Sequence, residues 1–221
     1  MLKSPFAFLA VLTLALVETQ GSENSHFLSY REPATQWVAA LPVGNGRLGA
    51  MVFGGPASEK LQLNEATLWS GGPRNWNNPG AKEILPQVRA AIFAGNYAEA
   101  DKLCKKMQGP YNESYQPLGD LLLDFQGTAD ATNYERRLDL DRAIASVTYR
   151  LGDATFTREV FSSFPDQVMV VSIRCDRPGR ISFFARLQSQ LHFTNGAAGA
   201  DTLVMRGKCP AHVDPSYLKS K

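Results

Sequence analysis

The second half of the chain alternates between apolar and polar residues with a period of two. Val147, Tyr149 and Leu151 are separated by polar side chains, and this spacing places them on one face of an extended strand. The segments between such runs are short and rich in Gly, Pro and Asp, which favours tight turns and antiparallel pairing. We therefore expect strands at 48–53, 60–63, 119–125, 144–151, 155–161, 167–175 and 180–187.

One stretch between these strands has helical periodicity instead. Apolar residues at 84, 85, 88, 91 and 92 share one helix face, and Gly95 suits the position after a helix end. Pro86 should lie near the first turn, because it would break an interior one. Asn96 and Glu99 match a capping box that starts a second helix. The expected fold is mainly β: a large antiparallel sandwich with a short helical insertion at about 79–107.

The first 21 residues have the pattern of a signal peptide. Lys3 precedes the apolar run 6–17, and Thr19 and Gly21 are small residues suited to cleavage after Gly21. The alternative, an anchoring helix, needs about 20 apolar residues, and Glu18 ends this run too early. We expect an exported protein, extracellular or periplasmic, with no membrane segment once the signal is removed.

Composition excludes several classes of function. The net charge is +2 with basic and acidic residues intermixed, so no surface for nucleic acid is indicated. The three histidines are scattered and no spacing matches a zinc site, so neither a metal nor a cofactor is expected. Three cysteines (Cys104, Cys175, Cys209) leave one without a partner. Either one thiol is free, or its partner lies on chain beyond this sequence.

Gly44, Gly46 and Gly49 have the G-x-G-x-x-G spacing of a dinucleotide-binding loop. That motif needs a strand before it and a helix after it. Residues 41–43 are a poor strand because Pro42 lacks an N–H, and the residues between Gly49 and Pro56 leave no room for a helix. We therefore exclude nucleotide binding and attribute the glycines to a turn and to close backbone approach.

The same glycines lie in a longer pattern. WVAALPVGNGRLGAMVFGG at 37–55, followed by LQLNEATLWSGGP at 61–73 and by Asn78-Pro79, resembles the opening of glycoside hydrolase family 95, which contains α-L-fucosidases and α-L-galactosidases. The segments YQPLGD at 115–120 and CPAHVDP at 209–215 are also similar to that family. The resemblance covers about 26–221.

The resemblance implies an N-terminal super-β-sandwich at 26–221, which family members follow with an (α/α)6 barrel and a smaller β-domain. The catalytic glutamate, and the residues that handle the attacking water, belong to the barrel, which this sequence lacks. No catalytic residue can therefore be assigned here. The implied parent reaction is hydrolysis of terminal α-L-fucosyl linkages with inversion. Its partners would be a fucosylated glycan and the missing barrel, and this chain alone would be inactive.

Seven residues are candidates for binding substrate. Glu65 has the chemistry of an acid or base, but we favour a structural role in which it holds a loop through backbone hydrogen bonds. Trp69 and Trp76 would stack on sugar rings while polar neighbours bond hydroxyls; alternatively, Trp69 belongs to the core, which we favour, and Trp76 packs against the missing barrel. The remaining candidates are Asn45, Arg47, Asn64 and Arg74.

Asn112-Glu113-Ser114 is a sequon for N-glycosylation, which matters only in a eukaryotic secretory pathway. Two other functions stay open from the residues alone: a free-standing carbohydrate-binding module and a purely structural sandwich. Sugar binding by the isolated chain would separate them.

Overall fold

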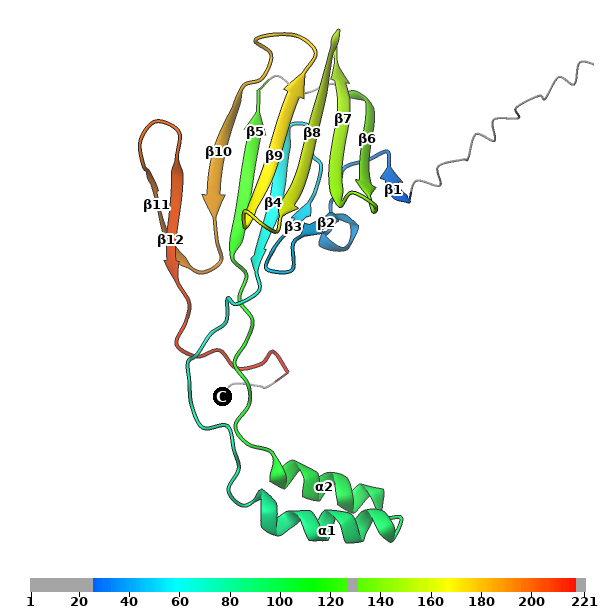
Figure 1. Ribbon diagram of the computed structural model, residues 1–221, viewed down its shortest axis with the longest axis vertical. Coiled ribbons are helices and arrows are strands. Elements are labelled where there is room, and N and C mark those ends of the chain that lie inside the picture. The colour runs from blue at the N-terminus through cyan, green and yellow to red at the C-terminus, as the bar shows by residue number, and fades with distance from the viewer. Residues whose placement is uncertain (1–25, 127–130, 218–221) are drawn as a thin grey trace, which may run out of the picture.

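Figure 1 shows a computed structural model of the chain, which describes residues 26–126 and 131–217. The predicted signal peptide at 1–21 lies outside the described residues, as do 218–221 at the end of the predicted domain. The described chain consists of a β-sandwich at one end, a pair of helices at the other, and extended segments that join them (Figure 1).

Two antiparallel sheets of five strands form the sandwich, which confirms the predicted fold class. Sheet I contains, in spatial order, β1 (Phe27–Tyr30), β6 (Thr132–Asp139), β7 (Ile144–Leu151), β8 (Ala154–Ser163) and β9 (Val168–Cys175). Sheet II contains β10 (Phe183–Gln188), β5 (Gly119–Phe125), β4 (Ser58–Glu65), β3 (Leu48–Val52) and β2 (Leu41–Gly44). A separate ribbon pairs β11 (His192–Ala197) with β12 (Leu203–Lys208).

The core lies between the two sheets, where alternate residues of each strand meet. Leu41, Val52 and Leu61 of sheet II pack in one cluster with Ala145 and Val160 of sheet I. Leu61 is fully buried, and burial of a leucine side chain contributes about 1.5–3 kcal/mol to the free energy of unfolding. Because the period is two, the intervening residues of β3 and β4 lie on the outer face of sheet II.

Residues 41–43, judged a poor strand from the sequence, do form one. β2 pairs along its length with β3, and Pro42 lies opposite Met51. The structure accommodates this proline because β2 is the edge strand of sheet II, so one of its sides has no ladder to donate to. The exclusion of a dinucleotide loop still holds, because the glycine turn leads into β3 rather than into a helix.

The helical insertion is confirmed between β4 and β5, as α1 (Ala81–Phe93) and α2 (Tyr97–Met107). Gly95 has a positive φ of 73°, as expected at a helix end, and Asn96 accepts a hydrogen bond from the Glu99 backbone N–H. Pro86, expected near the first turn, lies just past it inside the helix, because α1 begins at Ala81. The carbonyl left without a donor is that of Lys82, an exposed residue near the helix start, where water can reach it.

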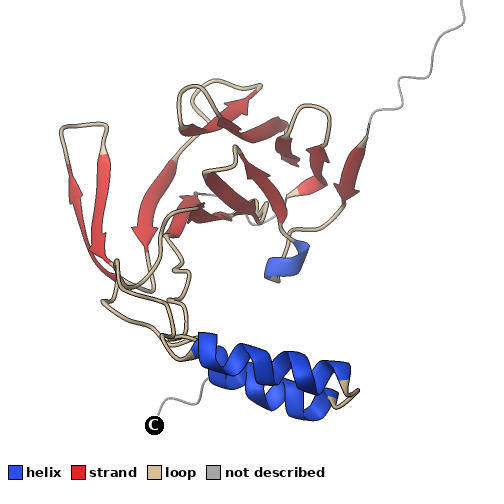
Figure 2. Cartoon of the chain, turned by 60° about the horizontal axis from the view of Figure 1, so that its bottom comes forward, coloured by secondary structure: helices blue, strands red, loops and turns tan. Residues whose placement is uncertain are grey.

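Three further features were not foreseen: the short strand β1, the strand β6, and the ribbon of β11 and β12, which Figure 2 shows beside the sandwich. The strand expected at 180–187 begins later, at Phe183. No helix within the described residues has the length and apolarity to cross a membrane.

Candidate functional site

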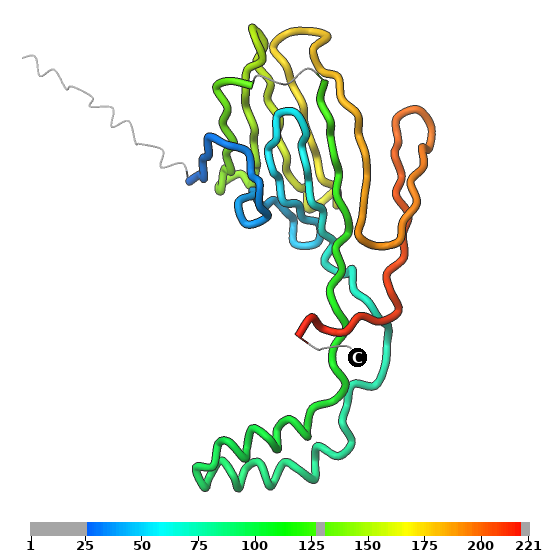
Figure 3. The backbone as a smooth tube through the Cα atoms, turned by 180° about the vertical axis from the view of Figure 1, so that it is seen from behind, coloured from blue at the N-terminus to red at the C-terminus, as the bar shows by residue number. Residues whose placement is uncertain are grey.

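A hollow of about 530 Å³ lies on the outer face of sheet II. Figure 3 views this sheet from the side opposite to sheet I. Strands β2, β3 and β4 form the floor of the hollow, and the short 3-10 helix at Trp37–Ala39 and the segment before β5 supply the rest of its lining. The lining includes the side chains of Trp37, Met51, Gln62, Asn64 and Tyr115.

Glu65 holds the loop that follows β4, as favoured from the sequence. Its carboxylate accepts hydrogen bonds from Arg47 Nε at 2.9 Å, from Thr67 N at 2.9 Å and from Thr67 Oγ1 at 2.7 Å. The hydrogen bond from Arg47, followed by that from the Thr67 hydroxyl, lowers the pKa of Glu65. A carboxyl held in its ionised form is poorly suited to donate a proton to a leaving group.

Asn45 is occupied by backbone contacts. Its Oδ1 accepts from the N–H groups of Arg47 and Leu48 at 3.1 and 2.8 Å, and its Nδ2 donates to the Ser163 carbonyl at 2.7 Å. Asn45 therefore fixes the turn between β2 and β3, and Arg47 positions Glu65. Neither residue lines the hollow.

Asn64 is the one sequence-predicted candidate that lines the hollow. The Tyr115 hydroxyl shares its single proton between two acceptors, Asn64 Oδ1 and the Glu65 carbonyl oxygen at 2.9 Å. Trp69 packs edge-on against Tyr115 with ring centroids 5.4 Å apart. The expectation that Trp69 belongs to the core was wrong, because 49% of its surface is exposed: the residue follows β4 and lies outside the strands of either sheet.

Arg74 and Trp76 lie on the segment that leads to α1, away from the hollow. The Arg74 guanidinium lies over the Trp76 ring, 4.1 Å from its centroid, and donates to the Tyr111 carbonyl at 2.9 Å. One face of the Trp76 ring is therefore covered by a cation from its own segment. The sequence-predicted residues thus fall into separate groups rather than forming one wall.

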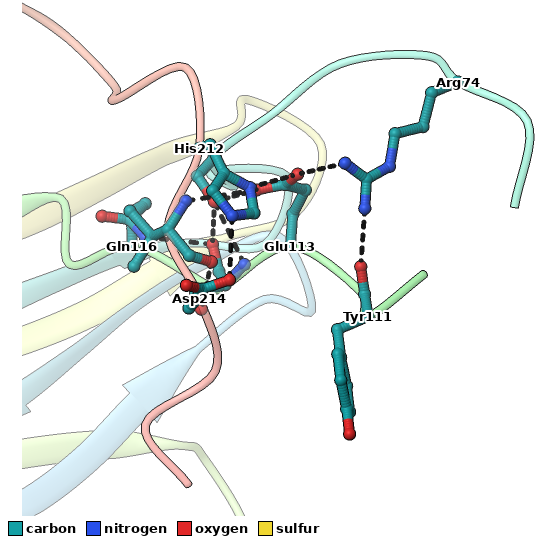
Figure 4. A network of polar contacts seen from close by, with 9 residues as sticks. Arg74, Tyr111, Glu113, Gln116, His212 and Asp214 are labelled. Carbon is teal, nitrogen blue, oxygen red and sulfur yellow. Dashed lines mark hydrogen bonds and ion pairs between the residues drawn. The ribbon is translucent and has the colours of Figure 1, made fainter. Parts of the chain in front are cut away.

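A second cluster joins three distant segments where the chain crosses between the sandwich and the helices (Figure 4). Both ring nitrogens of His212 face carboxylates: Nδ1 is 2.9 Å from Glu113 Oε1, and Nε2 is 2.9 Å from Asp214 Oδ1. Glu113 also accepts from Ser70 Oγ at 2.9 Å and from Val213 N at 3.3 Å. We call this cluster, with Arg74 at 3.7 Å from Glu113, the His212 clip.

In the clip, His212 and Glu113 each stabilise the ionised form of the other. The hydrogen bond to Glu113, followed by that to Asp214, raises the pKa of His212. The same hydrogen bond from His212 is the main cause that lowers the pKa of Glu113, although burial opposes it. The clip thus holds the segment 209–217 through ion pairs and hydrogen bonds. The Ser70 hydroxyl in it faces Glu113, whose lowered pKa makes that carboxylate a weak base.

Within 26–126 and 131–217 no group of three or more His, Cys, Asp or Glu residues is placed to hold a metal ion. All three cysteines, Cys104, Cys175 and Cys209, are free thiols. Asn112, the sequon residue, is exposed on the segment that returns from α2.

Sequence reasoning missed Trp37, Gln62 and Tyr115. Trp37 and Tyr115 belong to the quoted motifs but were not distinguished from scaffold residues. The signal for Gln62 was present: it alternates with Leu61 and Leu63, so its side chain lies on the outer face together with that of Asn64. What the pattern lacks is any sign that Trp37 and Tyr115 approach the same face.

Comparison with known proteins identifies relatives over almost the whole described chain. Residues 28–220 match the family model described as glycosyl hydrolase family 65, N-terminal domain. Alpha-L-fucosidase 2 of Arabidopsis thaliana is 39% identical over 209 residues, which cover 93% of this chain and 25% of the relative. Probable alpha-fucosidase A of Aspergillus niger is 38% identical over 140 residues (60% and 17%), and that of Aspergillus oryzae is 32% identical over 177 residues (76% and 24%). The chain spans about a quarter or less of the length of these relatives.

Proposed function

The chain belongs to the family of glycosyl hydrolase N-terminal domains described under family 65, and from this we propose that it is the N-terminal β-sandwich of an α-L-fucosidase. The parent enzyme would belong to glycoside hydrolase family 95 and hydrolyse terminal α-L-fucosyl linkages with inversion. The observation that carries the proposal is the 39% identity to a protein named alpha-L-fucosidase 2 over 93% of this chain.

The carboxyl groups of the chain support a non-catalytic role for this part of the enzyme. Inversion needs a protonated carboxylic acid and a carboxylate base on opposite sides of the sugar. Burial raises the pKa of Glu59, but this carboxyl group is 1% exposed in the core, out of reach of a sugar. Glu65, the accessible candidate, is held ionised by Arg47 and Thr67. We therefore assign the catalytic residues to a helical barrel elsewhere in the parent.

The proposal also includes the setting of the enzyme. The signal-peptide pattern at 1–21 supports secretion to the extracellular space or the periplasm. The partners would be a fucosylated glycan and the catalytic barrel, which would pack against the sandwich within the same polypeptide.

The test is an assay of this chain and of the full-length parent on an aryl α-L-fucoside and on 2′-fucosyllactose. We expect hydrolysis by the parent and none by the chain alone. Turnover by the chain would contradict the location of catalysis, and a parent inactive on both substrates would contradict the assigned reaction.

A further inference from the structure

Gly49 lies in the floor of the hollow on sheet II. A Cβ at this position would meet its nearest neighbours, the Val43 carbonyl oxygen and Asn64 Cβ, at 3.5 and 3.8 Å, which are ordinary contacts. Its φ is not positive, in contrast to that of Gly46 (90°) and Gly54 (82°). The backbone therefore does not require glycine at 49, whereas the hollow would be filled by a larger residue.

Two aromatic side chains line the hollow. Trp37 is 58% exposed on the 3-10 helix before β2, the edge strand of sheet II. Tyr115, on the segment before β5, lies beside the end of β4: its hydroxyl faces Asn64 Oδ1 and the Glu65 carbonyl, and Trp69 packs against its ring. Tyr115 is thus fixed in place before any ligand arrives, which lowers the entropic cost of binding.

Neutral amides provide the polar groups between these rings. Gln62 and Asn64 line the hollow, and across the described residues neither the Gln62 amide nor Asn64 Nδ2 has a hydrogen-bond partner in the protein. A second hollow of about 430 Å³ shares Gln62 and Pro117 with the first and is lined by Asp120, Gln188 and Gln190. Because the two hollows share Gln62 and Pro117, they adjoin, and we treat them as one groove. Its second end is lined mostly by polar residues, together with Phe193.

A pyranose ring matches this arrangement, because its C–H face packs on an aromatic ring while its hydroxyls hydrogen-bond to amides. A nucleotide or other anion would find no basic residue lining the first hollow. An all-apolar partner would leave the two amides buried and unpaired, at a cost in free energy.

We propose that the groove on the outer face of sheet II is a non-catalytic binding site for a pyranose oligosaccharide, with one sugar ring stacked on Trp37 and its hydroxyls bonded by Gln62 and Asn64. The site rests on the proposed function, because it would hold part of the glycan whose fucosyl end is hydrolysed elsewhere in the parent. The polar end of the groove would take the next sugar unit.

The test is calorimetric titration of the whole chain with 2′-fucosyllactose and with lactose, each into the millimolar range. Removal of a central aromatic contact costs more than about 1.4 kcal/mol, so Trp37→Ala should weaken binding about tenfold or more. Gly49→Val should abolish binding by filling the floor, while its β-branched side chain suits a strand. Phe93→Ala is the matched control, because Phe93 is 88% exposed on α1 and should leave binding unchanged.

Saturable binding of either sugar that Trp37→Ala weakens and Gly49→Val abolishes, with unchanged circular dichroism, supports the site. Absence of binding to the unaltered chain would overturn it, and so would affinity that neither groove variant changes. The outcome is separable from that of the proposed function: a parent that hydrolyses fucosides while this chain binds no sugar refutes the groove alone. Sugar binding here with an inactive parent refutes only the assigned reaction.

Discussion

Glu59 and Arg158 are the charged residues that the sandwich encloses most completely, each with 1% of its surface exposed. Glu59 lies on β4 of sheet II and Arg158 on β8 of sheet I, and their charged groups are 3.2 Å apart. Burial raises the pKa of Glu59 even though Arg158 opposes the shift. Arg158 also donates to the Gly55 carbonyl at 2.6 Å, so one side chain links both sheets.

Loss of one member of this pair should be far more costly than loss of both. Glu59→Gln leaves the Arg158 charge buried without a counter-ion, and such changes lower the free energy of unfolding by about 3–5 kcal/mol. The double variant Glu59→Gln, Arg158→Met removes both charges and should recover much of that loss. Urea denaturation of the unaltered chain, the single variant and the double variant measures the free energy of unfolding of each. Equal destabilisation by the single and double variants would contradict the ion-pair account.

The glycines within residues 42–55 have different structural roles. At Gly44 a Cβ would meet the Leu48 carbonyl oxygen at 2.9 Å, and at Gly54 it would meet the Tyr134 hydroxyl at 2.6 Å. These two positions confirm the expected close approach of neighbouring chain, and Gly46 confirms the turn. Gly49 is the exception, since neither requirement applies to it.

At the scale of elements, the segment 209–217 is held to the rest of the chain by the His212 clip. The groups that face His212 are Glu113 on the segment after α2 and Asp214 on its own segment, and Arg74 faces Glu113 from the segment before α1. Protonated His212 donates to both carboxylates. Neutral His212 has one N–H, so it leaves the other carboxylate facing a lone pair.

The clip should therefore respond to pH. The raised pKa of His212 means that its contribution is complete below the ordinary value of 6.5 and is lost as the pH rises through the folded-state value. The lowered pKa of Glu113 means that its contribution is complete above 4.5 and is lost as the pH falls. We expect the segment 209–217 to be held most tightly between pH 4.5 and 6.5.

Amide exchange of 209–217 as a function of pH, corrected for intrinsic exchange rates, measures this effect. His212→Gln should remove the loss of protection above pH 6.5, whereas the matched variant His192→Gln, on β11, should keep it. A protection profile of the unaltered chain that stays flat across that range would contradict the clip.

For the whole molecule, the sandwich and the helical pair differ in how much packing supports them. The described helices bury Val88, Ala100 and Leu103, while Phe93 and Tyr97 at their connection are 88% and 71% exposed. Figure 1 shows the pair joined to the sandwich by extended segments. Helices of 13 and 11 residues are marginal in water without tertiary packing.

We therefore expect the two parts to open independently. Amides of α1 and α2 should exchange much faster than those of β7 and β8, because local opening of the helical pair exposes few buried side chains. Hydrogen–deuterium exchange with mass spectrometry measures both regions in one experiment, and the central strands serve as the internal reference. Equal protection of helices and strands would show that the pair is packed more firmly than these contacts indicate.

The sequence by itself determined the features that depend on near neighbours. The period-two alternation of Val147, Tyr149 and Leu151 predicted a strand, and Asn96 with Gly95 located the boundary between the helices, because strand faces and helix caps are set within a few residues. The resemblance of 37–79 to a fucosidase family was likewise recognisable without coordinates, and the comparisons confirm it.

Only the tertiary structure decided which of these residues meet. Pro42 is acceptable in a strand because β2 lies at an edge, Trp69 is exposed because it lies outside the strands of either sheet, and Trp37 and Tyr115 line one groove because β2, β3 and β4 pair side by side. Such juxtapositions depend on strand order and on contacts between distant segments. No local periodicity encodes them, because the alternation that fixes which way a side chain points is the same wherever its strand lies in the sheet.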